Sequence, residues 1–428
     1  MTDPHPTDVA RHRTDRAWVS PHNFAPAARP SRLDGGGVYL YDVTLRDGEQ
    51  YPGVAFSREE RVRIGVELAE IGIARIETGL PIVSKSVFEA TRELAGMGLP
   101  AQFVPQCRAD MDDVRLTAET GTGALVIVHT INPLHCRHAF GLDEAALIDK
   151  LVSTVAFAKA EGLHTSFMAA DVFRCDLDYL LRVFGAVIEQ ARPDVIVATD
   201  TVGCATPWAV ELVIARLRAA FPDVAIEYHG HNDFGLGTAT ALGAVRAGAD
   251  GVQCSFNGLG ERTGNAPTEE VVAALELAMD VRTGVDLGRL RAVSELIQDL
   301  SQVRVSAAKP IVGPAIFTTE SHIVGHIQDL MQREAGIDTG MYAFSPTLFG
   351  HGEVSFVLGK GSGPTSVRKT AERLGLTLDE GEADALLERV KAEGRFRKSV
   401  VDDHTFVHLL SKLRSEAAAD RGSAGVPG

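Results

Sequence analysis

Two histidines stand two positions apart in the segment YHGHNDFG, at His229 and His231. On a β-strand, residues i and i+2 project from the same face, so both imidazoles would point the same way. Asp42 ends an earlier apolar run and could supply a carboxylate, and Asn265 in ERTGNAP could add an amide oxygen. This mixed set suits a catalytic divalent ion (Zn²⁺, Mn²⁺, Co²⁺ or Mg²⁺) better than a closed structural zinc site. The alternative is that both histidines are ordinary hydrogen-bonded residues.

Charged residues also crowd the segment YDVTLRDGEQYPGVAF, directly after that apolar run. Charged side chains at the end of a buried strand are costly unless something compensates them. Arg46 stands four residues after Asp42, and its guanidinium could neutralise negative charge on a 2-oxo acid held by the metal ion. A structural salt bridge from Arg46 to a neighbouring acid is the alternative. We expect Asp42 and Arg46 to carry the chemistry. Asp47, Glu49 and Gln50 are expected to support them.

Short β-rich runs alternate with longer amphipathic segments from residue 38 onward. Eight such runs predict a (β/α)₈ TIM barrel over residues 38–300, with an open doubly wound sheet as the main competitor. The active site of such a barrel forms at the carboxyl ends of the strands, and polar side chains cluster there in this sequence. The predicted strands cover 38–43, 74–79, 101–106, 124–130, 164–169, 195–200, 225–231 and 251–256.

Three further regions flank this barrel. Residues 1–37 are predicted to form a flexible N-terminal arm. Residues 301–415 predict helical C-terminal subdomains, an appendage that could cover the barrel mouth. Residues 416–428 predict a disordered tail. We expect a homodimer in which the appendage of one subunit crosses to the barrel mouth of its neighbour.

The composition excludes several classes of partner. The 428 residues include 42 Lys plus Arg and 57 Asp plus Glu, a formal net charge of −15. An acidic chain argues against nucleic acid or an anionic membrane as the main partner, although a local basic pocket can still bind a small anion. Five scattered cysteines without a CxxC motif indicate reduced thiols and a cytoplasmic location. No apolar stretch reaches the roughly 18 residues of a membrane span, and no secretory signal is visible.

Six segments together resemble the isopropylmalate/homocitrate/citramalate synthase family, one of the barrel metallolyases that also include hydroxymethylglutaryl-CoA lyase. They are DVTLRDGEQYPGVAF, ETGLP, DTVGCATP, HGHNDFGLGTATALGAVRAGAD, NGLGERTGNAPTEEVVAAL and VLGKGSGPTSVRKTAERLG, and they span about residues 38 to 400. The resemblance implies a Claisen condensation in which acetyl-CoA loses a methyl proton and attacks a metal-bound 2-oxo acid. Hydrolysis of the CoA thioester then gives a 2-hydroxy-2-alkyl diacid.

The resemblance also implies roles for single residues. Asp42, His229, His231 and Asn265 correspond to metal-related positions. Arg46 would polarise the keto group, and Thr201 in DTVG would contact the substrate carboxylate. The pocket-lining residues would be Gln50 and Glu77.

The chain departs from the family pattern at two places. After the fifth strand the family has a catalytic glutamate, where this chain has Ala170, so Asp171 or another group would take over its work. The family also brings a catalytic histidine from the appendage. Both His322 and His326 qualify here, and Tyr342 matches a tyrosine that the family uses at the subunit boundary.

The segment HTINPLHCRHAFG after the fourth strand bears on the substrate. Its His129, Asn132 and Arg137 are expected to bind substrate, and its basic character suggests an acceptor with a second anionic group, such as 2-oxoglutarate or phosphonopyruvate. Ser166 weakens the 2-oxoglutarate case, because homocitrate synthases carry an arginine there. Other readings are an isopropylmalate or citramalate synthase, a carbon–carbon lyase of the hydroxymethylglutaryl-CoA lyase type, and a metal-binding paralogue without catalysis.

Overall fold

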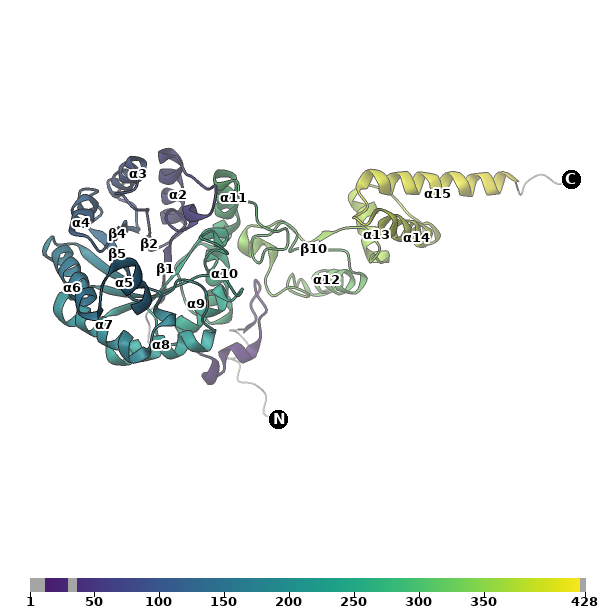
Figure 1. The fold of residues 1–428 in the computed structure, drawn as a ribbon. Coiled ribbons are helices and arrows are strands. Elements are labelled where there is room, and N and C mark those ends of the chain that lie inside the picture. The colour runs from purple at the N-terminus through teal and green to yellow at the C-terminus, as the bar shows by residue number, and fades with distance from the viewer. Residues whose placement is uncertain (1–11, 30–36, 424–428) are drawn as a thin grey trace. The chain divides into compact units, whose positions relative to one another are not determined.

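The computed structural model describes residues 12–29 and 37–423 of the chain (Figure 1). The chain divides into two compact units: residues 20–312 form one, and residues 1–19 with 313–428 form the other. We refer to them as the barrel unit and the C-terminal unit. Within the described residues, no helix is both long enough and apolar enough to cross a membrane.

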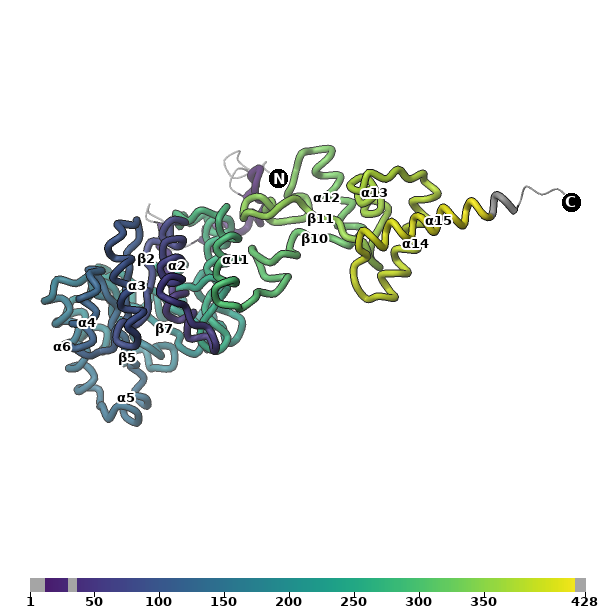
Figure 2. Tube along the Cα trace, turned by 90° about the horizontal axis from the view of Figure 1, so that it is seen from above, coloured from purple at the N-terminus to yellow at the C-terminus, as the bar shows by residue number. Residues whose placement is uncertain are grey.

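The barrel unit is built on one parallel sheet with the strand order β3-β2-β1-β9-β8-β7-β6-β5-β4. Strands β3 and β4 are consecutive pieces of one extended segment, and they pair with β2 and β5 respectively. That segment therefore joins the two ends of the sheet, and a TIM-barrel-like (β/α)₈ arrangement results, as predicted (Figures 1 and 2). The strands are β1 Tyr39–Asp42, β2 Arg75–Ile76, β3 Gln102–Phe103, β4 Gln106–Arg108, β5 Ala124–Thr130, β6 His164–Ala170, β7 Val195–Asp200, β8 Ala225–Gly230 and β9 Gly251–Cys254.

Helices surround this sheet (Figure 1). Many begin at a polar N-cap; Ser57 and Glu60, for example, form a complete capping box at the start of α2. The helices of the barrel unit are α2 Arg58–Glu70, α3 Lys85–Ala95, α4 Met111–Ala118, α5 Pro133–Phe140, α6 Glu144–Ala160, α7 Leu177–Ala191, α8 Pro207–Ala220, α9 Gly237–Arg246, α10 Thr268–Ala273 and α11 Leu290–Ser301.

The interior of the barrel has an apolar part, and β8 adds a polar part to it. Tyr41, Val126 and Val197 belong to one buried apolar cluster inside the sheet. On β8, Glu227 and His229 are two residues apart and both fully or almost fully buried. Residues two apart share a face of the strand, so the polar interior leads directly to the barrel mouth.

The C-terminal unit has its own core. It contains a short parallel pair of strands, β10 Thr318–Thr319 and β11 Ser355–Phe356, and the four α-helices α12 to α15. Leu386 of α14 and Phe406 of α15 are fully buried in a shared apolar cluster. The helices are α12 His322–Ala335, α13 Pro364–Arg373, α14 Glu380–Arg397 and α15 Asp403–Ser423.

Two sequence expectations differ from what is observed. The boundary between the two units falls at residue 313, whereas the sequence predicted the barrel boundary at residue 301. The predicted disorder from residue 416 is wrong for residues 416–423, because α15 continues through them. Residues 424–428 lie outside the described residues.

The predicted N-terminal arm is described in part. It contains two short 3₁₀ helices, Pro21–Phe24 and Pro26–Ala28, each with proline at its start. Ala17 forms an isolated β-bridge with Phe344 inside the C-terminal unit. Residues 1–11 and 30–36 of the arm lie outside the described residues.

Candidate active site

The two histidines of the HxH segment meet at the carboxyl end of β8. His229 is the fifth residue of that strand, and His231 follows just after the strand ends. Their Nε2 atoms are 3.3 Å apart, and both side chains are buried. The structure therefore brings the pair together, as strand periodicity predicted.

Asp47 completes a three-residue cluster with these histidines. The turn after β1 folds back, with the Asp47 amide donating to the Val43 carbonyl at 2.8 Å. This turn places Asp47 Oδ2 3.3 Å from the Nε2 atom of His229 and 3.3 Å from that of His231. Among the described residues, these three are the group whose ligand atoms are close enough together to hold one metal ion.

The prediction that Asp42 supplies the carboxylate ligand is corrected by this geometry. Tyr41 lies in the apolar cluster inside the barrel, so the next residue on the strand, Asp42, points to the opposite face. There Asp42 Oδ1 accepts from the Thr44 amide at 2.8 Å, and Oδ2 accepts from the Thr268 hydroxyl at 3.1 Å. Asp42 therefore anchors the start of α10. Asp47, which was expected only to support Asp42, is the carboxylate that lies with the two histidines.

Asn265 lies beside the cluster. Its backbone forms an antiparallel bridge with His231, which puts the two side chains next to one another on the same face. The Nδ2 group donates to the Leu259 carbonyl at 2.9 Å. Asn265 Oδ1 is buried and has no hydrogen-bond partner among the described residues. An amide oxygen left in this way is costly in a folded protein unless a cation or ligand meets it.

The charges of the cluster also suit a cation. Burial lowers the pKa of His229 to about 4, so its imidazole is neutral at pH 7. Burial opposes ionisation of Asp47, but the neighbouring Arg46 guanidinium outweighs it and holds the pKa of Asp47 well below the usual range. A carboxylate and a neutral imidazole thus converge on one point in a buried place. The donors fit a divalent ion with mixed nitrogen and oxygen ligation.

Arg46 stands directly beside this cluster. Its Nε lies 2.9 Å from Glu77 Oε2, and its Nη1 lies 3.2 Å from Asp47 Oδ2. Gln50 Oε1 is 3.4 Å from the same Nη1. The third nitrogen, Nη2, is buried without a hydrogen-bond partner among the described residues. Arg46 therefore forms structural salt bridges through Nε and Nη1, and its buried Nη2 remains available to donate to a substrate oxygen.

Glu77, at the carboxyl end of β2, is the second titratable group near Arg46. Burial raises its pKa to about 7, although the Arg46 guanidinium opposes the rise. Its side chain is fully buried. A carboxyl with this pKa can take up or release a proton near neutral pH.

Asp171 is held differently from what its predicted catalytic role would need. Its backbone is left-handed, with φ of 66°. Arg174 donates to both carboxylate oxygens of Asp171, at 2.7 and 2.8 Å, and Asn132 Nδ2 donates to Oδ2 at 2.7 Å. The Asp171 amide donates to the Thr201 hydroxyl at 2.8 Å. These contacts make Asp171 an anchor of the loops after β5, β6 and β7, and they argue against a free catalytic base.

The remaining predicted residues of the barrel unit lie around the same mouth. Asn132 caps α5 through Leu134 and has both ends of its side chain engaged. His129 at the end of β5 is paired through Nδ1 with the Thr130 carbonyl at 2.7 Å, and burial lowers its pKa. Arg137 is exposed on α5. Their contact with a substrate stays a prediction.

The three residues predicted from the appendage lie in the C-terminal unit. His322 is the first residue of α12 and His326 follows one turn later, with ring centroids 5.9 Å apart. His326 Nδ1 is 3.4 Å from the Thr365 hydroxyl. Tyr342 packs against Phe317, and burial raises its pKa. Their catalytic roles stay predictions.

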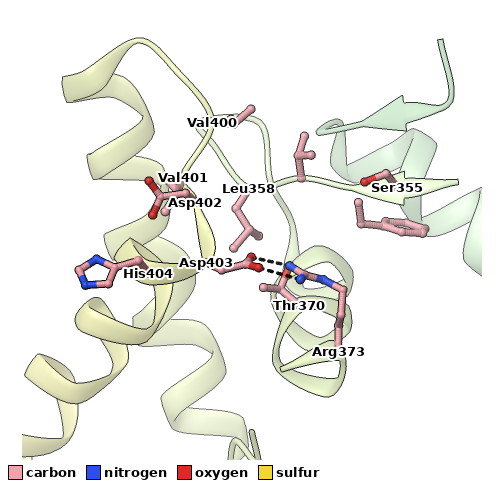
Figure 3. Close-up of a pocket in the computed structure, with 11 residues that line it drawn as sticks. Ser355, Leu358, Thr370, Arg373, Val400, Val401, Asp402, Asp403 and His404 are labelled. Carbon is pink, nitrogen blue, oxygen red and sulfur yellow. Dashed lines mark hydrogen bonds and ion pairs between the residues drawn. The ribbon is translucent and has the colours of Figure 1, made fainter. Parts of the chain in front are cut away.

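The C-terminal unit also contains a surface hollow of about 630 Å³ (Figure 3). Arg373 and Asp403 face one another across it and form a two-fold ion pair, one contact of which is 2.8 Å. The two charges neutralise each other. None of the residues predicted to be catalytic, substrate-binding or metal-binding lines this hollow. It does not resemble a reaction site.

A parallel barrel with a buried carboxylate and two imidazoles at its strand ends defines a TIM-barrel-like enzyme with a candidate divalent-cation site. The family model described as HMGL-like matches residues 37–297. Homocitrate synthase AksA of Methanothermobacter thermautotrophicus is 31% identical over 400 residues, 93% of this chain and 98% of that protein. 2-Isopropylmalate synthase 2 of Caldanaerobacter subterraneus subsp. tengcongensis is 36% identical over 376 residues, 88% of this chain and 96% of that protein.

The chain belongs to the HMGL-like family. Among solved structures, the HMG-CoA lyase of Bacillus subtilis aligns with a TM-score of 0.57 at 23% identity, covering 63% of this chain and 95% of that one. This likeness confirms the fold of the barrel unit.

The assignment of Asp47 rather than Asp42 to the cation site is testable by metal affinity. Asp47→Asn should weaken Mn²⁺ binding by more than the roughly 10–100-fold loss typical of outer contacts, because it removes a ligand charge. Asp42→Asn should bind close to wild type, because that side chain faces the helices. Titration calorimetry on both purified variants measures this. The opposite order of affinities would return Asp42 to the ligand set.

The stability of the metal-free protein should depend on pH through Asp42. Burial raises its pKa to about 7, so folding takes up a proton, and stability is lost as pH rises from the unfolded pKa through the folded one. Asp42→Asn should therefore gain stability relative to wild type by about 1.4 kcal/mol per pH unit from about pH 4 to 7, and no more above that. Urea unfolding in the presence of a chelator measures the difference.

Asp149→Asn, on the exposed surface of α6, is the control for this series. Its side chain is exposed in the folded protein, so this substitution should change the free energy of unfolding by no more than about 0.5 kcal/mol. A difference for Asp42→Asn that stays constant with pH would show that the buried carboxyl does not take up a proton on folding.

Proposed function

We propose that this protein is an acyltransferase that condenses acetyl-CoA with a 2-oxo acid to give a 2-hydroxy-2-alkyl diacid, of the alkylmalate or homocitrate type. The observation that carries the proposal is the cluster of Asp47, His229 and His231 beside the unpartnered Nη2 of Arg46. Membership of the HMGL-like family and relatives named as synthases support it.

The binding step follows from the charges at the mouth. Asp47, His229, His231 and Asn265 would hold the divalent ion, which supplies a Lewis acid for the keto and carboxylate oxygens of the oxo acid. The Arg46 guanidinium is fixed by Glu77 and Asp47, so it meets negative charge on the substrate without having to reorganise. Thr201, held through its oxygen by the Asp171 amide, still has its hydroxyl proton to donate to a substrate carboxylate.

The reaction requires one proton to leave the acetyl methyl group and a carbon–carbon bond to form at the keto carbon as its C=O π bond opens. The keto oxygen must take up a proton to become the hydroxyl, and water must release CoA from the thioester. Asp171 is unsuited to accept that proton, because Arg174 and Asn132 occupy its carboxylate. Glu77, with a pKa of about 7, fits proton exchange better. His322 or His326 of the C-terminal unit is the other candidate.

The acceptor is proposed to carry a second anionic group, such as a carboxylate or phosphonate. A hollow of about 440 Å³ opens beside the ends of β4 and β5, and Lys150, Arg108 and His129 line it. Asp110 also lines the hollow, and Arg108 is already paired with Asp113, so Lys150 is the lining cation that we propose meets a second charge. This observation favours a dianionic acceptor over the branched or unsubstituted chain of an isopropylmalate or citramalate synthase.

A panel of 2-oxo acids tests the reaction and its acceptor. Thiol release from acetyl-CoA should require both substrates and should be faster with 2-oxoglutarate or phosphonopyruvate than with 2-oxoisovalerate or pyruvate. Cleavage of a single hydroxyacyl-CoA without an oxo acid would instead indicate the lyase reaction. If metal-loaded protein neither releases thiol with any acceptor nor cleaves a hydroxyacyl-CoA, only the non-catalytic alternative remains.

Replacement of Arg46 tests the role of the guanidinium. Arg46→Lys keeps one positive charge but loses the fork that spans Glu77, Asp47 and the substrate, so kcat should fall by about 10²–10³-fold. Thermal unfolding of the variant should remain cooperative. Arg58→Lys, an exposed arginine paired with Glu93, is the matched control and should leave kcat unchanged. An Arg46→Lys variant with wild-type turnover would remove Arg46 from the reaction.

A further inference from the structure

A chain of buried polar groups runs inside the barrel below the candidate metal site. It begins at Glu227 of β8, which shares the interior face with His229 and is fully buried. The Glu227 carboxylate forms an ion pair with Arg75 of β2 and accepts from the Tyr39 hydroxyl at 2.9 Å. Arg75 also donates to the Ser166 hydroxyl at 3.0 Å. The ion pair keeps Glu227 an acceptor of hydrogen bonds.

Gln253 of β9 links this carboxylate to the metal site. In the parallel register, Gln253 is the direct neighbour of His229 on one side and of Tyr41 on the other, so it also faces the interior. Its Nε2 donates to Glu227 Oε2 at 2.7 Å, and its Oε1 lies 3.1 Å from His229 Nδ1. Gln253 is fully buried, and both ends of its amide are used.

Hydrogen-bond chemistry fixes the direction of this chain. A carboxylate paired with arginine can only accept, so the NH₂ end of Gln253 must face Glu227. The amide oxygen must then face His229, and it can only accept. His229 Nδ1 therefore carries the proton. With Nδ1 engaged by Gln253, Nε2 is the ring nitrogen that faces the cluster, 3.3 Å from Asp47 Oδ2.

We propose that Gln253 is a positioning residue that, with Glu227 and Arg75, fixes the tautomer and ring orientation of His229 for binding of the divalent ion. This inference rests on the cation site of the proposed function. A glutamine suits the position because a glutamate there would set two carboxylates face to face, whereas an amide joins an acceptor to a donor. Partners of this kind orient metal-bound histidines and raise their affinity for the ion.

The tautomer can be measured on the metal-free wild-type protein. With ¹⁵N-labelled histidine, long-range nitrogen–proton correlation spectra at neutral pH distinguish the two neutral forms, and His229→Asn assigns the signal. The expected result is a single form with the proton on Nδ1 of His229. A proton on Nε2 would overturn the inference without any variant of Gln253.

Gln253→Met tests the consequence, because methionine keeps the length of the side chain and removes the amide. The expected result is a mixture of both His229 tautomers and a loss of about 10–100-fold in Mn²⁺ affinity in chelator competition. Gln298→Met on α11 is the matched control, since Gln298 is also buried and bonded at both ends. It should change neither the spectrum nor the affinity.

The outcomes separate this inference from the proposed function. If wild-type protein binds Mn²⁺ and Gln253→Met leaves both the tautomer and the affinity unchanged, the inference fails while the cation site stands. If wild-type protein binds no divalent ion, the cation site fails, and the spectra of the metal-free protein still show whether Gln253 sets the tautomer.

Discussion

The site depends on three electron-rich atoms that converge where water is excluded: one carboxylate oxygen of Asp47 and the Nε2 atoms of His229 and His231. Bringing such atoms together costs free energy unless a cation meets them. Arg46 supplies part of that charge from the side, through Asp47 and Glu77. The divalent ion would supply the rest, and the unpartnered Asn265 Oδ1 gives it a further oxygen.

The period of two along the strands determines which residues share in this arrangement. On β8 it aligns Glu227 with His229, and the same phase continues to His231 beyond the strand end. On β9 it places Gln253 beside His229, and Cys254 beside Asp42 on the other face. One face thus carries the reaction groups and their support, while the other holds the strands to the helices. The function of the barrel follows from this separation.

The strands and the convergence of His229 and His231 were predictable because their signals are local. Eight β-rich runs alternate with helical segments, and the HxH spacing needs only strand geometry. The carboxylate was not predictable in the same way. In β1 the residues around Asp42 are apolar on both faces. The sequence therefore shows no alternation of polar and apolar residues that would indicate which side chains point inward. Gln253 did carry a signal, as a polar residue in the run GVQCSF, but its partners on β8 become visible only in the folded barrel. The ion pair between Arg174 and Asp171 forms at a residue with a left-handed backbone, and local sequence patterns do not reveal that conformation.

Asp47, His229 and His231 are proposed to bind one divalent ion, and the proposed reaction depends on that ion. The most direct measurement is an anomalous difference map from crystals grown with Mn²⁺, recorded at its absorption edge. We predict one strong peak within coordination distance of Asp47 Oδ2 and of both Nε2 atoms, with Asn265 Oδ1 beside it. A peak bound to Asp42, or none between the two histidines at saturating Mn²⁺, would contradict it.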